Sequence, residues 1–438
     1  MTTSPTAISL FGNHMEQQQS VWATALQAEQ FDAAVIHSGS QRYSFLDDYH
    51  YPFRPNPHFL AWLPLTHHDE SVLIIRPGQR PVLYYFQPDD YWYSPPADPE
   101  SWWSEYFDVR RVRETGQWRS AIPEGRIAYV GDAPALSDEI ELNPARLLNR
   151  LHLARTVKTA YELACLREAV GIAARAHVAA AEAFREGQSE FAIHQAYLQA
   201  AQQEDADLPY GSIVALNEHG AVLHYQQHER SVPGVHRSFL IDAGASCHGY
   251  CSDITRTYSA TPGHFADLIV AMDRLQLDLC HAMRAGADYK ALHLQAHAAI
   301  AQLLVDAELI HCSAEQALSN GLTSVFFPHG LGHYLGLQTH DVAGLLANAD
   351  GTEIARPDGH PFLRLTRVLE AGNVVTVEPG LYFIDSLLER WRAGPDAKLI
   401  HWAAIEELRP YGGIRIEDDV VVTTGQPENM SRDAFAAL

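Results

Sequence analysis

Short apolar runs bounded by turn-forming residues alternate with helix-like stretches through the first 150 residues. The runs at residues 31–36 and 126–130 have the length and composition of strands. Residues 71–75 and 81–86 form two further runs separated by a Pro-Gly pair, which predicts a β-hairpin. The pattern predicts a mixed α/β amino-terminal unit, and it contains no glycine-rich phosphate-binding motif.

The pattern changes near residue 155. Thr159 and Glu162 form a capping box at the start of an Ala-rich helical stretch that runs to about residue 185. A second helix is expected after Ser189. We therefore predict two domains, an amino-terminal one over residues 1–155 and a second one over residues 156–438.

The second domain is expected to be rich in strands beyond Tyr210. Two further helices are predicted within it, at about residues 264–285 and 288–306. Strand-like runs at residues 238–245, 251–258 and 374–377 lie between and beyond these helices. This mixture predicts an α+β domain.

Residues 43–59 form an aromatic and proline-rich segment within the amino-terminal domain. Such a composition suits a stiff, exposed loop. Two interpretations remain open: local packing of the amino-terminal domain, or a lid or subunit contact that reaches a binding pocket.

Composition narrows the class of protein. Apolar residues make up 47% of the 438 residues and charged residues 19%, as in a globular protein with a substantial core. The formal net charge of −23 argues against nucleic acid or an anionic membrane as a partner, because both are bound through excess Lys and Arg. It leaves room for a small substrate in a locally charged pocket.

Cysteine usage and the amino terminus point to the cytoplasm. The five cysteines are sparse and scattered, which is typical of free thiols in a reducing compartment. Residues 1–7 do not read as a signal peptide, and no apolar run reaches the roughly 18 residues of a membrane span. We expect a soluble cytoplasmic protein.

Four carboxylates are associated with apolar, strand-like runs. A hairpin would bring Asp242 close to Asp253, and Glu378 and Glu417 fall in or at the end of two later runs. A carboxylate in an apolar strand is costly unless it is paired or bound to metal. Any one of the four can be explained by an ordinary salt bridge, whereas the whole set points to divalent cations.

A histidine segment at residues 327–341 accompanies these acids. His329, His333 and His340 alternate there with three glycines, which allow the backbone to approach other groups closely. His and Gly are also common in surface loops, but three of each within so short a span argue against that explanation. Two divalent ions would neutralise four carboxylates, and oxygen-rich ligation with one imidazole favours Mn²⁺, with Co²⁺ or Zn²⁺ as alternatives.

Together these residues resemble a known superfamily of metallopeptidases. The spacing of Asp242 and Asp253, the segment from His329 to His340, Glu378 in Val-Glu-Pro-Gly and Glu417 in Gly-Ile-Arg-Ile-Glu are similar to the methionine aminopeptidase, aminopeptidase P and prolidase superfamily. The aromatic segment at residues 43–53 narrows the resemblance to bacterial prolidases, a group that includes the organophosphorus acid anhydrolases. The resemblance implies an α/β amino-terminal domain followed by a pita-bread catalytic domain.

The resemblance also implies roles for individual residues. The metal ligands would be Asp242, Asp253, His333, Glu378 and Glu417. The catalytic groups would be His340, His224, Glu378 and Arg415, and the substrate-binding groups Arg364, His329, Tyr210, Tyr289, Asp47 and Asp48. Arg364 would hold the substrate carboxylate, for which a planar guanidinium is suited.

Three of these residues have plainer explanations when each is taken alone. His224 would be a structural histidine, Arg364 would pair with Glu370, and Tyr289 would cap a helix.

The activity implied is that of an Xaa-Pro dipeptidase in which a hydroxide bridging two metal ions attacks the scissile carbonyl. His340 would assist at the carbonyl oxygen, and Glu378 would relay a proton to the prolyl nitrogen. We expect a homodimer in which Asp47 or Asp48 of the partner subunit limits peptide length. The alternatives are an aminopeptidase P acting on longer peptides, an organophosphate-hydrolysing side activity, and a non-enzymatic binding module on the same fold.

Overall fold

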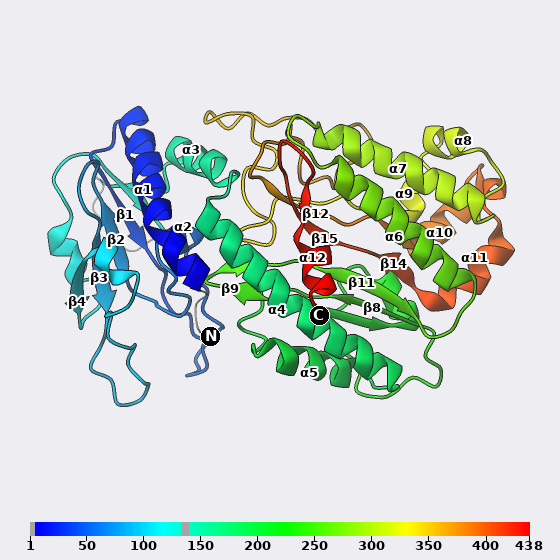
Figure 1. Ribbon diagram of the computed structural model, residues 1–438, viewed down its shortest axis with the longest axis horizontal. Helices are drawn as coiled ribbons and strands as arrows, with labels where there is room; N and C mark the ends of the chain where they lie inside the picture. The colour runs from blue at the N-terminus through cyan, green and yellow to red at the C-terminus, as the bar shows by residue number, and fades with distance from the viewer. Residues whose placement is uncertain (1–4, 133–139) are drawn as a thin grey trace. The chain divides into compact units, whose positions relative to one another are not determined.

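The computed structural model describes residues 5–132 and 140–438 (Figure 1). Residues 1–4, which belong to the stretch used to judge the absence of a signal peptide, lie outside the described part. The chain divides into two compact units. The first holds residues 1–165, 247–250 and 346–353, and the second holds residues 166–246, 251–345 and 354–438.

The first unit is a six-stranded mixed sheet with helices. Its strand order is β4-β3-β2-β1-β5-β6, in which β1 pairs antiparallel with β2 and parallel with β5. Its main elements are α1 (Pro5–Ala28), β1 (Ala33–His37), α2 (Pro57–Leu60), β2 (Val72–Ile75), β3 (Val82–Phe86), β4 (Asp108–Val112), β5 (Ile127–Val130), β6 (Ile140–Leu142) and α3 (Ala145–Arg155). The predicted hairpin is confirmed, since β2 and β3 pair antiparallel. Buried apolar side chains of β1, β2 and β5 form its core.

The aromatic segment at residues 43–59 is largely exposed, as predicted. An isolated antiparallel β-bridge pairs Tyr43 with His50 within it. Its end differs from the predicted loop. Residues Pro57–Leu60 form the short helix α2, in which Phe59 is fully buried, because Asn56 caps the helix and Pro57 favours its first turn.

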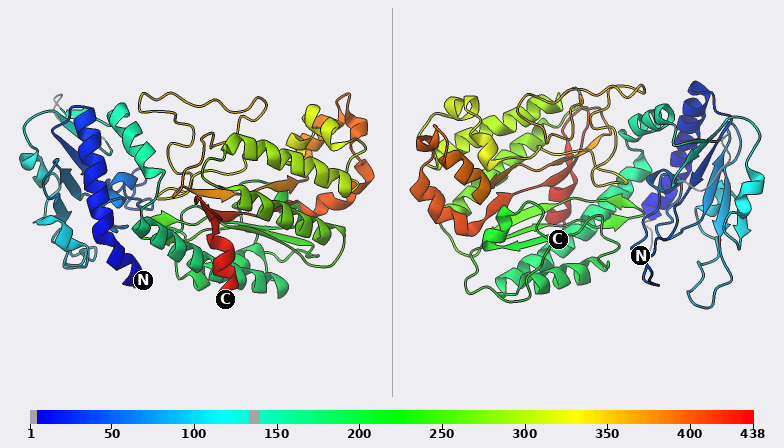
Figure 2. Two further views of the ribbon diagram at one scale, coloured as in Figure 1. Left: turned by 45° about the horizontal axis from the view of Figure 1, so that its top comes forward. Right: turned by 180° about the vertical axis from the view of Figure 1, so that it is seen from behind.

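The second unit holds short sheets between two pairs of helices. Its elements are the greater part of α4 (Ala160–Arg185), α5 (Glu190–Ala201), β7 (Ile213–Leu216), β8 (Ser238–Asp242), β11 (Thr255–Ser259), α6 (His264–Ala282), α7 (Tyr289–Asp306), α8 (Ala314–Ser319), α9 (Thr323–Phe326), β12 (Val374–Val377), β13 (Gly380–Tyr382), α10 (Asp385–Arg392), α11 (Trp402–Leu408), β14 (Gly413–Arg415), β15 (Asp418–Val421), β16 (Glu428–Asn429) and α12 (Met430–Ala436). Two small strands, β9 (Ser246–Cys247) and β10 (Tyr250–Cys251), pair with each other. Figures 1 and 2 show α4 and α5 on one side of the strands and α6 and α7 on the other.

The helices begin where their capping residues predict. The Thr159 N–H donates to Glu162 at 2.7 Å and the Glu162 N–H to the Thr159 hydroxyl at 3.3 Å, which completes the capping box of α4. Ser189 caps α5 in the same way through the Ala192 N–H. The predicted helices at 264–285 and 288–306 correspond to α6 and α7.

The strands of the second unit form three small sheets that meet at one place. Their orders are β11-β8-β7, β12-β15-β16 and β13-β14. A backbone bridge between Thr255 and Glu417 joins the first sheet to the segment that links β14 to β15. Strand ends from all three sheets therefore meet where the predicted acids lie.

No helix in the described part of the chain is both long enough and apolar enough to cross a membrane.

Candidate metal centre

Asp242 and Asp253 lie at the ends of paired strands. Asp242 is the last residue of β8 and stands opposite Thr255 of β11, while Asp253 precedes β11 by two residues. The Tyr210 hydroxyl lies 2.7 Å from Asp242 Oδ1 and 2.5 Å from Asp253 Oδ1. The expectation that a hairpin brings the two aspartates together is confirmed, although Asp253 lies just outside a regular strand.

Two glutamates reach the same place from other sheets. Glu378 directly follows β12, and Glu417 lies between β14 and β15. The Glu417 N–H donates to the Thr255 carbonyl at 3.0 Å, and the Thr255 hydroxyl donates to Glu417 Oε2 at 2.7 Å. Donor atoms of Asp253, His333 and Glu417 all lie within 4.8 Å of one another, and all three residues are buried.

The histidine segment runs against β12. The Thr376 N–H donates to the His333 carbonyl at 3.0 Å. A Cβ atom on Gly332 would lie 2.5 Å from the Tyr289 hydroxyl and closer still to the Thr376 carbonyl oxygen. Glycine is needed here because the backbone approaches β12 too closely for a side chain.

His333 is oriented by its own backbone neighbourhood. Its Nδ1 lies 2.9 Å from the Tyr334 carbonyl oxygen, which can only accept a hydrogen bond, so the ring proton is on Nδ1. Nε2, the nitrogen left for a ligand, then faces Asp253 Oδ2 at 3.5 Å and Glu378 Oε1 at 3.7 Å. This is how a metal-ligating histidine is held.

His329 belongs to a chain of hydrogen bonds that starts at Arg415. Arg415 donates to Asp242 Oδ2 at 2.6 Å and to the Tyr382 hydroxyl at 2.9 Å. The Tyr382 hydroxyl in turn lies 2.8 Å from His329 Nε2, and His329 Nδ1 donates to the Gly330 carbonyl at 2.8 Å. The imidazole nitrogens of His329 are thus both engaged by protein groups.

Tyr382 and Thr255 are site residues that the sequence reasoning did not single out. Thr255 follows Asp253 by two residues, and Tyr382 follows Glu378 in the Glu-Pro-Gly-Leu-Tyr run. The sequence offered one signal for them: each follows an acid by an even number of residues, and residues two apart on a strand share a face. Tyr382 contacts Arg415 of the neighbouring strand β14, and Thr255 contacts Glu417 from outside its own sheet, so both roles depend on residues distant in sequence.

Three exposed basic residues lie near one another beside His333: His224, His340 and Arg364. The His340 ring centroid is 4.4 Å from that of His333. Partial burial, followed by the positive charges of His333, Arg364 and His224, lowers the pKa of His340 to about 3. The positive charges of these basic groups are therefore concentrated around His340, next to His333.

Arg364 does not pair with Glu370. The Glu370 carboxylate lies 3.1 Å from Arg367 instead, and no side-chain partner of Arg364 is found in residues 5–132 and 140–438. Its guanidinium is therefore available to an anionic ligand.

Of the remaining predicted site residues, Tyr289 lies next to the histidine segment at Gly332, and Asp47 and Asp48 lie in the first unit. Tyr289 is fully buried, and its hydroxyl donates to the Thr376 carbonyl at 2.9 Å, so it supports β12 from beneath. Asp47 and Asp48 belong to the first unit, where they are exposed on a turn. The Asp47 N–H donates to the Ser44 carbonyl at 3.2 Å, and the Asp48 N–H to Asp47 Oδ1 at 2.7 Å.

Three consecutive acids show which carboxylates are held by salt bridges and which are not. Asp418 is buried between Arg256 and Arg432, both at 2.7 Å, and although burial alone would raise its pKa, these charges lower it to about 2. Asp419 instead accepts from the Asp253 N–H at 3.0 Å, and burial raises its pKa. Glu417 faces the other acids, so an ordinary salt bridge explains Asp418 and not Glu417.

The clustered acids are electrostatically unfavourable in the protein alone. Burial, followed by repulsion from the neighbouring carboxylates, raises the pKa of Glu417 well above its usual range. Burial raises the pKa of Glu378 to about 7 and also raises that of Asp253. Burial would lower the pKa of His333, but its hydrogen bond and charge interaction with Asp253 raise it.

The donor set fits two divalent cations. Asp242, Asp253, Glu378 and Glu417 supply four carboxylates, and His333 supplies one imidazole with Nε2 directed at them. Among residues 5–132 and 140–438, Arg415 is the one Arg or Lys whose side chain forms an ion pair with these carboxylates, through Asp242. Divalent ions would remove the repulsion that raises the carboxylate pKa values.

Two protein families match separate parts of the chain. Metallopeptidase family M24 matches residues 164–424, and the family described as Xaa-Pro dipeptidase, N-terminal domain, matches residues 9–153. An Xaa-Pro dipeptidase of Xanthomonas campestris pv. campestris strain 8004 is 50% identical over 439 residues, covering 99% of this chain and 100% of its own. One of Stenotrophomonas maltophilia is 48% identical over 434 residues and covers 98% of each chain.

Solved structures show the same fold at lower identity. Aminopeptidase P of Escherichia coli with the inhibitor Pro-Leu has a TM-score of 0.73 at 23% identity, covering 99% of this chain and 96% of its own. The aminopeptidase PepP of Pseudomonas aeruginosa has a TM-score of 0.72 at 21% identity, covering 98% of each chain. The predicted architecture, an α/β amino-terminal part and a pita-bread catalytic part, is confirmed.

Replacing Gly332 tests the close packing beneath His333. In Gly332→Ala the new methyl group would push the histidine segment away from β12, and overpacking of this kind costs about 1–3 kcal/mol. We expect a lower melting temperature and reduced metal content after purification. Gly425→Ala is the matched control, because a Cβ there meets nothing within 4 Å. Equal stability and metal content in the two variants would contradict the packing argument.

Proposed function

Because the chain belongs to metallopeptidase family M24, we propose that it is a metal-dependent Xaa-Pro dipeptidase. The observation that carries this proposal is the identity of about 50%, over nearly the whole chain, to proteins of that name. The match of residues 9–153 to the dipeptidase amino-terminal domain supports a dipeptidase over an aminopeptidase P. The substrate class is dipeptides with a carboxy-terminal proline.

The residues we propose as ligands of two divalent ions are Asp242, Asp253, His333, Glu378 and Glu417. The convergence of these donors from three sheets and the raised carboxylate pKa values support this assignment. Two divalent ions, for which the carboxylate-rich set favours Mn²⁺, would polarise the scissile carbonyl and activate a water molecule. Co²⁺ and Zn²⁺ are the alternatives.

Glu378 is the residue we propose for proton transfer. Its Oε2 lies 3.6 Å from His329 Nδ1 and its Oε1 3.7 Å from His333 Nε2, so both oxygens face the site. A carboxylate in this position can accept a proton from water and deliver it to the prolyl nitrogen, which must be protonated to leave.

His340, His224 and Arg364 are the groups we propose to face the substrate. An imidazole N–H of His340 would donate a hydrogen bond to the carbonyl oxygen as negative charge develops there. Arg364 would bind the carboxylate of the terminal proline, since no acid of the described chain occupies it. His224 acts on His329 and His340 through its charge and would lie beside the substrate.

Arg415 and Tyr382 are proposed to position other groups. The Arg415–Tyr382–His329 hydrogen bonds fix the His329 ring, and the Arg415–Asp242 contact fixes a ligand. Tyr210 does the same for the two aspartates it spans. These residues would lower the cost of organising the site before substrate binds.

We also propose that the protein works as a homodimer in the cytoplasm. Phe45 and Leu46, which precede Asp47, are 88% and 90% exposed. Apolar side chains exposed together at the tip of a loop are typical of a protein contact. Asp47 or Asp48 of the partner subunit would then close one side of the substrate pocket.

Activity against peptides of two lengths tests the function directly. We expect hydrolysis of Gly-Pro to be lost after chelation and restored by Mn²⁺. The tripeptide Gly-Pro-Ala should have a kcat/KM about 10- to 100-fold lower, because it forfeits a charge-assisted contact worth about 1.5–3 kcal/mol. Activity that survives complete metal removal, or equal activity on the two peptides, would contradict the proposal.

Two histidine variants separate metal binding from catalysis. His333→Ala should lose bound metal, because it removes a ligand. His340→Ala should keep its metal and lose about 100- to 1,000-fold in kcat, the usual effect of removing one donor to a developing oxyanion. Metal analysis and steady-state kinetics on the same samples check this. Equal metal loss in both variants would show that His340 is a ligand as well.

The double variant Asp47→Ala, Asp48→Ala tests the length limit. With these carboxylates gone, we expect a higher kcat/KM for tripeptides while Gly-Pro hydrolysis and metal content stay nearly constant. Asp306→Ala, which removes an exposed acid of the second unit, is the control. Unchanged length preference in the double variant would count against a role for the loop.

A further inference from the structure

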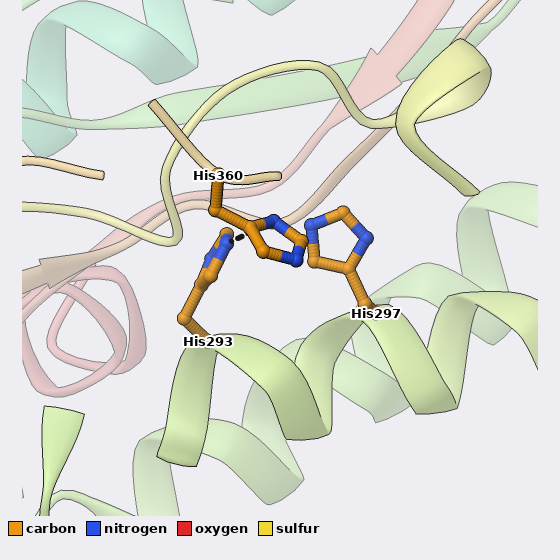
Figure 3. Close-up of side chains that lie close together, drawn as sticks. All are labelled: His293, His297 and His360. Carbon is orange, nitrogen blue, oxygen red and sulfur yellow. Dashed lines mark hydrogen bonds between the residues drawn. The ribbon is translucent and has the colours of Figure 1, made fainter. Parts of the chain in front are cut away.

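A second cluster of imidazoles lies in the second unit and takes no part in the proposed reaction. His293 and His297 are one turn apart on α7, and His360 comes from the irregular segment before β12. Figure 3 shows the ring of His360 between the other two. Each residue offers a ring nitrogen, and these atoms lie within 4.8 Å of one another.

The cluster is buried and partly unsatisfied. His293 and His297 are 1% and 2% exposed. His293 Nε2 lies 2.9 Å from His360 Nδ1, whereas the buried Nδ1 of His293 has no hydrogen-bond partner within the described residues. A buried polar atom without a partner is energetically unfavourable, so the protein groups alone leave this cluster incomplete.

The three imidazole rings are in the neutral protonation state, which is the one that binds metal. Burial, followed by repulsion among the rings, lowers the pKa values of His293 and His297 to about 3. No carboxylate in the described chain forms an ion pair with any of the three histidines, so they stay neutral at physiological pH. A neutral imidazole nitrogen has the lone pair that a metal ion requires.

Thr323 fixes the orientation of one ring. Its hydroxyl lies 2.9 Å from His297 Nδ1, which leaves His297 Nε2 free to face the cluster. Histidines four residues apart on a helix can bind one ion together, and a hydrogen bond at the other ring nitrogen is the usual support for such a ligand.

We propose that His293, His297 and His360 form a second, mononuclear site for Zn²⁺. Three imidazoles without carboxylates suit Zn²⁺, in contrast to the oxygen-rich centre that favours Mn²⁺. His360 is half-buried and stands on a loop, which gives the ion a route from solvent.

An ion bound at this site would link the segment that carries Arg364 to helix α7. His360 is four residues before Arg364, and Arg356 donates to the Leu363 carbonyl at 2.7 Å within the same segment. An ion bound to α7 through two ligands and to His360 through the third holds this segment against the helix. Zn²⁺ thereby restricts the position of Arg364.

The Phe327 ring separates this cluster from the acidic centre. Its centroid lies 4.9 Å from that of His297 and 4.8 Å from that of His329. The two sites are therefore neighbours that share no ligand.

Zn²⁺ stoichiometry of the full-length protein tests the proposal. Metal is removed with a chelator, and Zn²⁺ alone is added back under equilibrium dialysis with elemental analysis. His360→Asn, at a half-buried loop position, should bind one Zn²⁺ fewer per chain than the unaltered protein. His297→Gln should do the same, or weaken this ion about 100-fold or more, since loss of a supporting group alone costs 10- to 100-fold.

Two controls keep the result specific. His311→Asn removes an exposed histidine outside the cluster and should leave the stoichiometry unchanged. His333→Ala should retain the ion of the three-histidine site while losing metal from the acidic centre, which distinguishes failure of this proposal from failure of the proposed function.

Hydrogen exchange gives a readout that is independent of activity. Zn²⁺ should slow amide exchange over residues 354–366 in the unaltered protein and in His333→Ala, and leave it unchanged in His360→Asn. The proposal is overturned if His360→Asn and His297→Gln, folded as judged by circular dichroism, bind as many Zn²⁺ ions as the unaltered protein with the same affinity.

Discussion

Four carboxylates held together inside the protein are the constraint on which the second unit depends. Charges of one sign in a small, poorly solvated volume repel each other, and the part of the chain that the structure describes supplies one guanidinium, that of Arg415, as their ion-pair partner. The raised pKa values of Glu378 and Glu417 express this cost. A structure that maintains such an arrangement needs both a rigid frame and a cationic partner, and two divalent ions would meet the second need.

The frame consists of strand ends. Asp242 and Asp253 come from one pair of strands, and Glu378 comes from the end of a second sheet. Glu417 comes from the residues between β14 and β15, where its backbone pairs with Thr255. The backbone of the histidine segment is bonded to β12 and needs glycine where the two approach. The basic residues His224, His340 and Arg364 are exposed and lie close together, so they would attract a peptide carboxylate.

Sequence patterns predicted the parts of this site that depend on local order. The capping box at Thr159, the hairpin of β2 and β3 and the pairing of Asp242 with the strand after Asp253 all follow from short-range signals. The positions of Glu417 beside Thr255 and of Tyr382 beside His329 do not, because each depends on a contact between segments that are far apart in the sequence. The predicted loop at residues 43–59 was wrong at its end, where Asn56 and Pro57 begin a short helix. In the three-histidine cluster, the pair on α7 is visible in the sequence, but nothing local associates it with His360.

Anomalous diffraction at the manganese edge, from crystals of the full-length protein grown with Mn²⁺, tests most directly whether the acids of the second unit enclose two divalent ions. We expect two peaks about 3.5–4 Å apart, bounded by Asp242, Asp253, His333, Glu378 and Glu417. A map without manganese among these side chains would contradict this expectation.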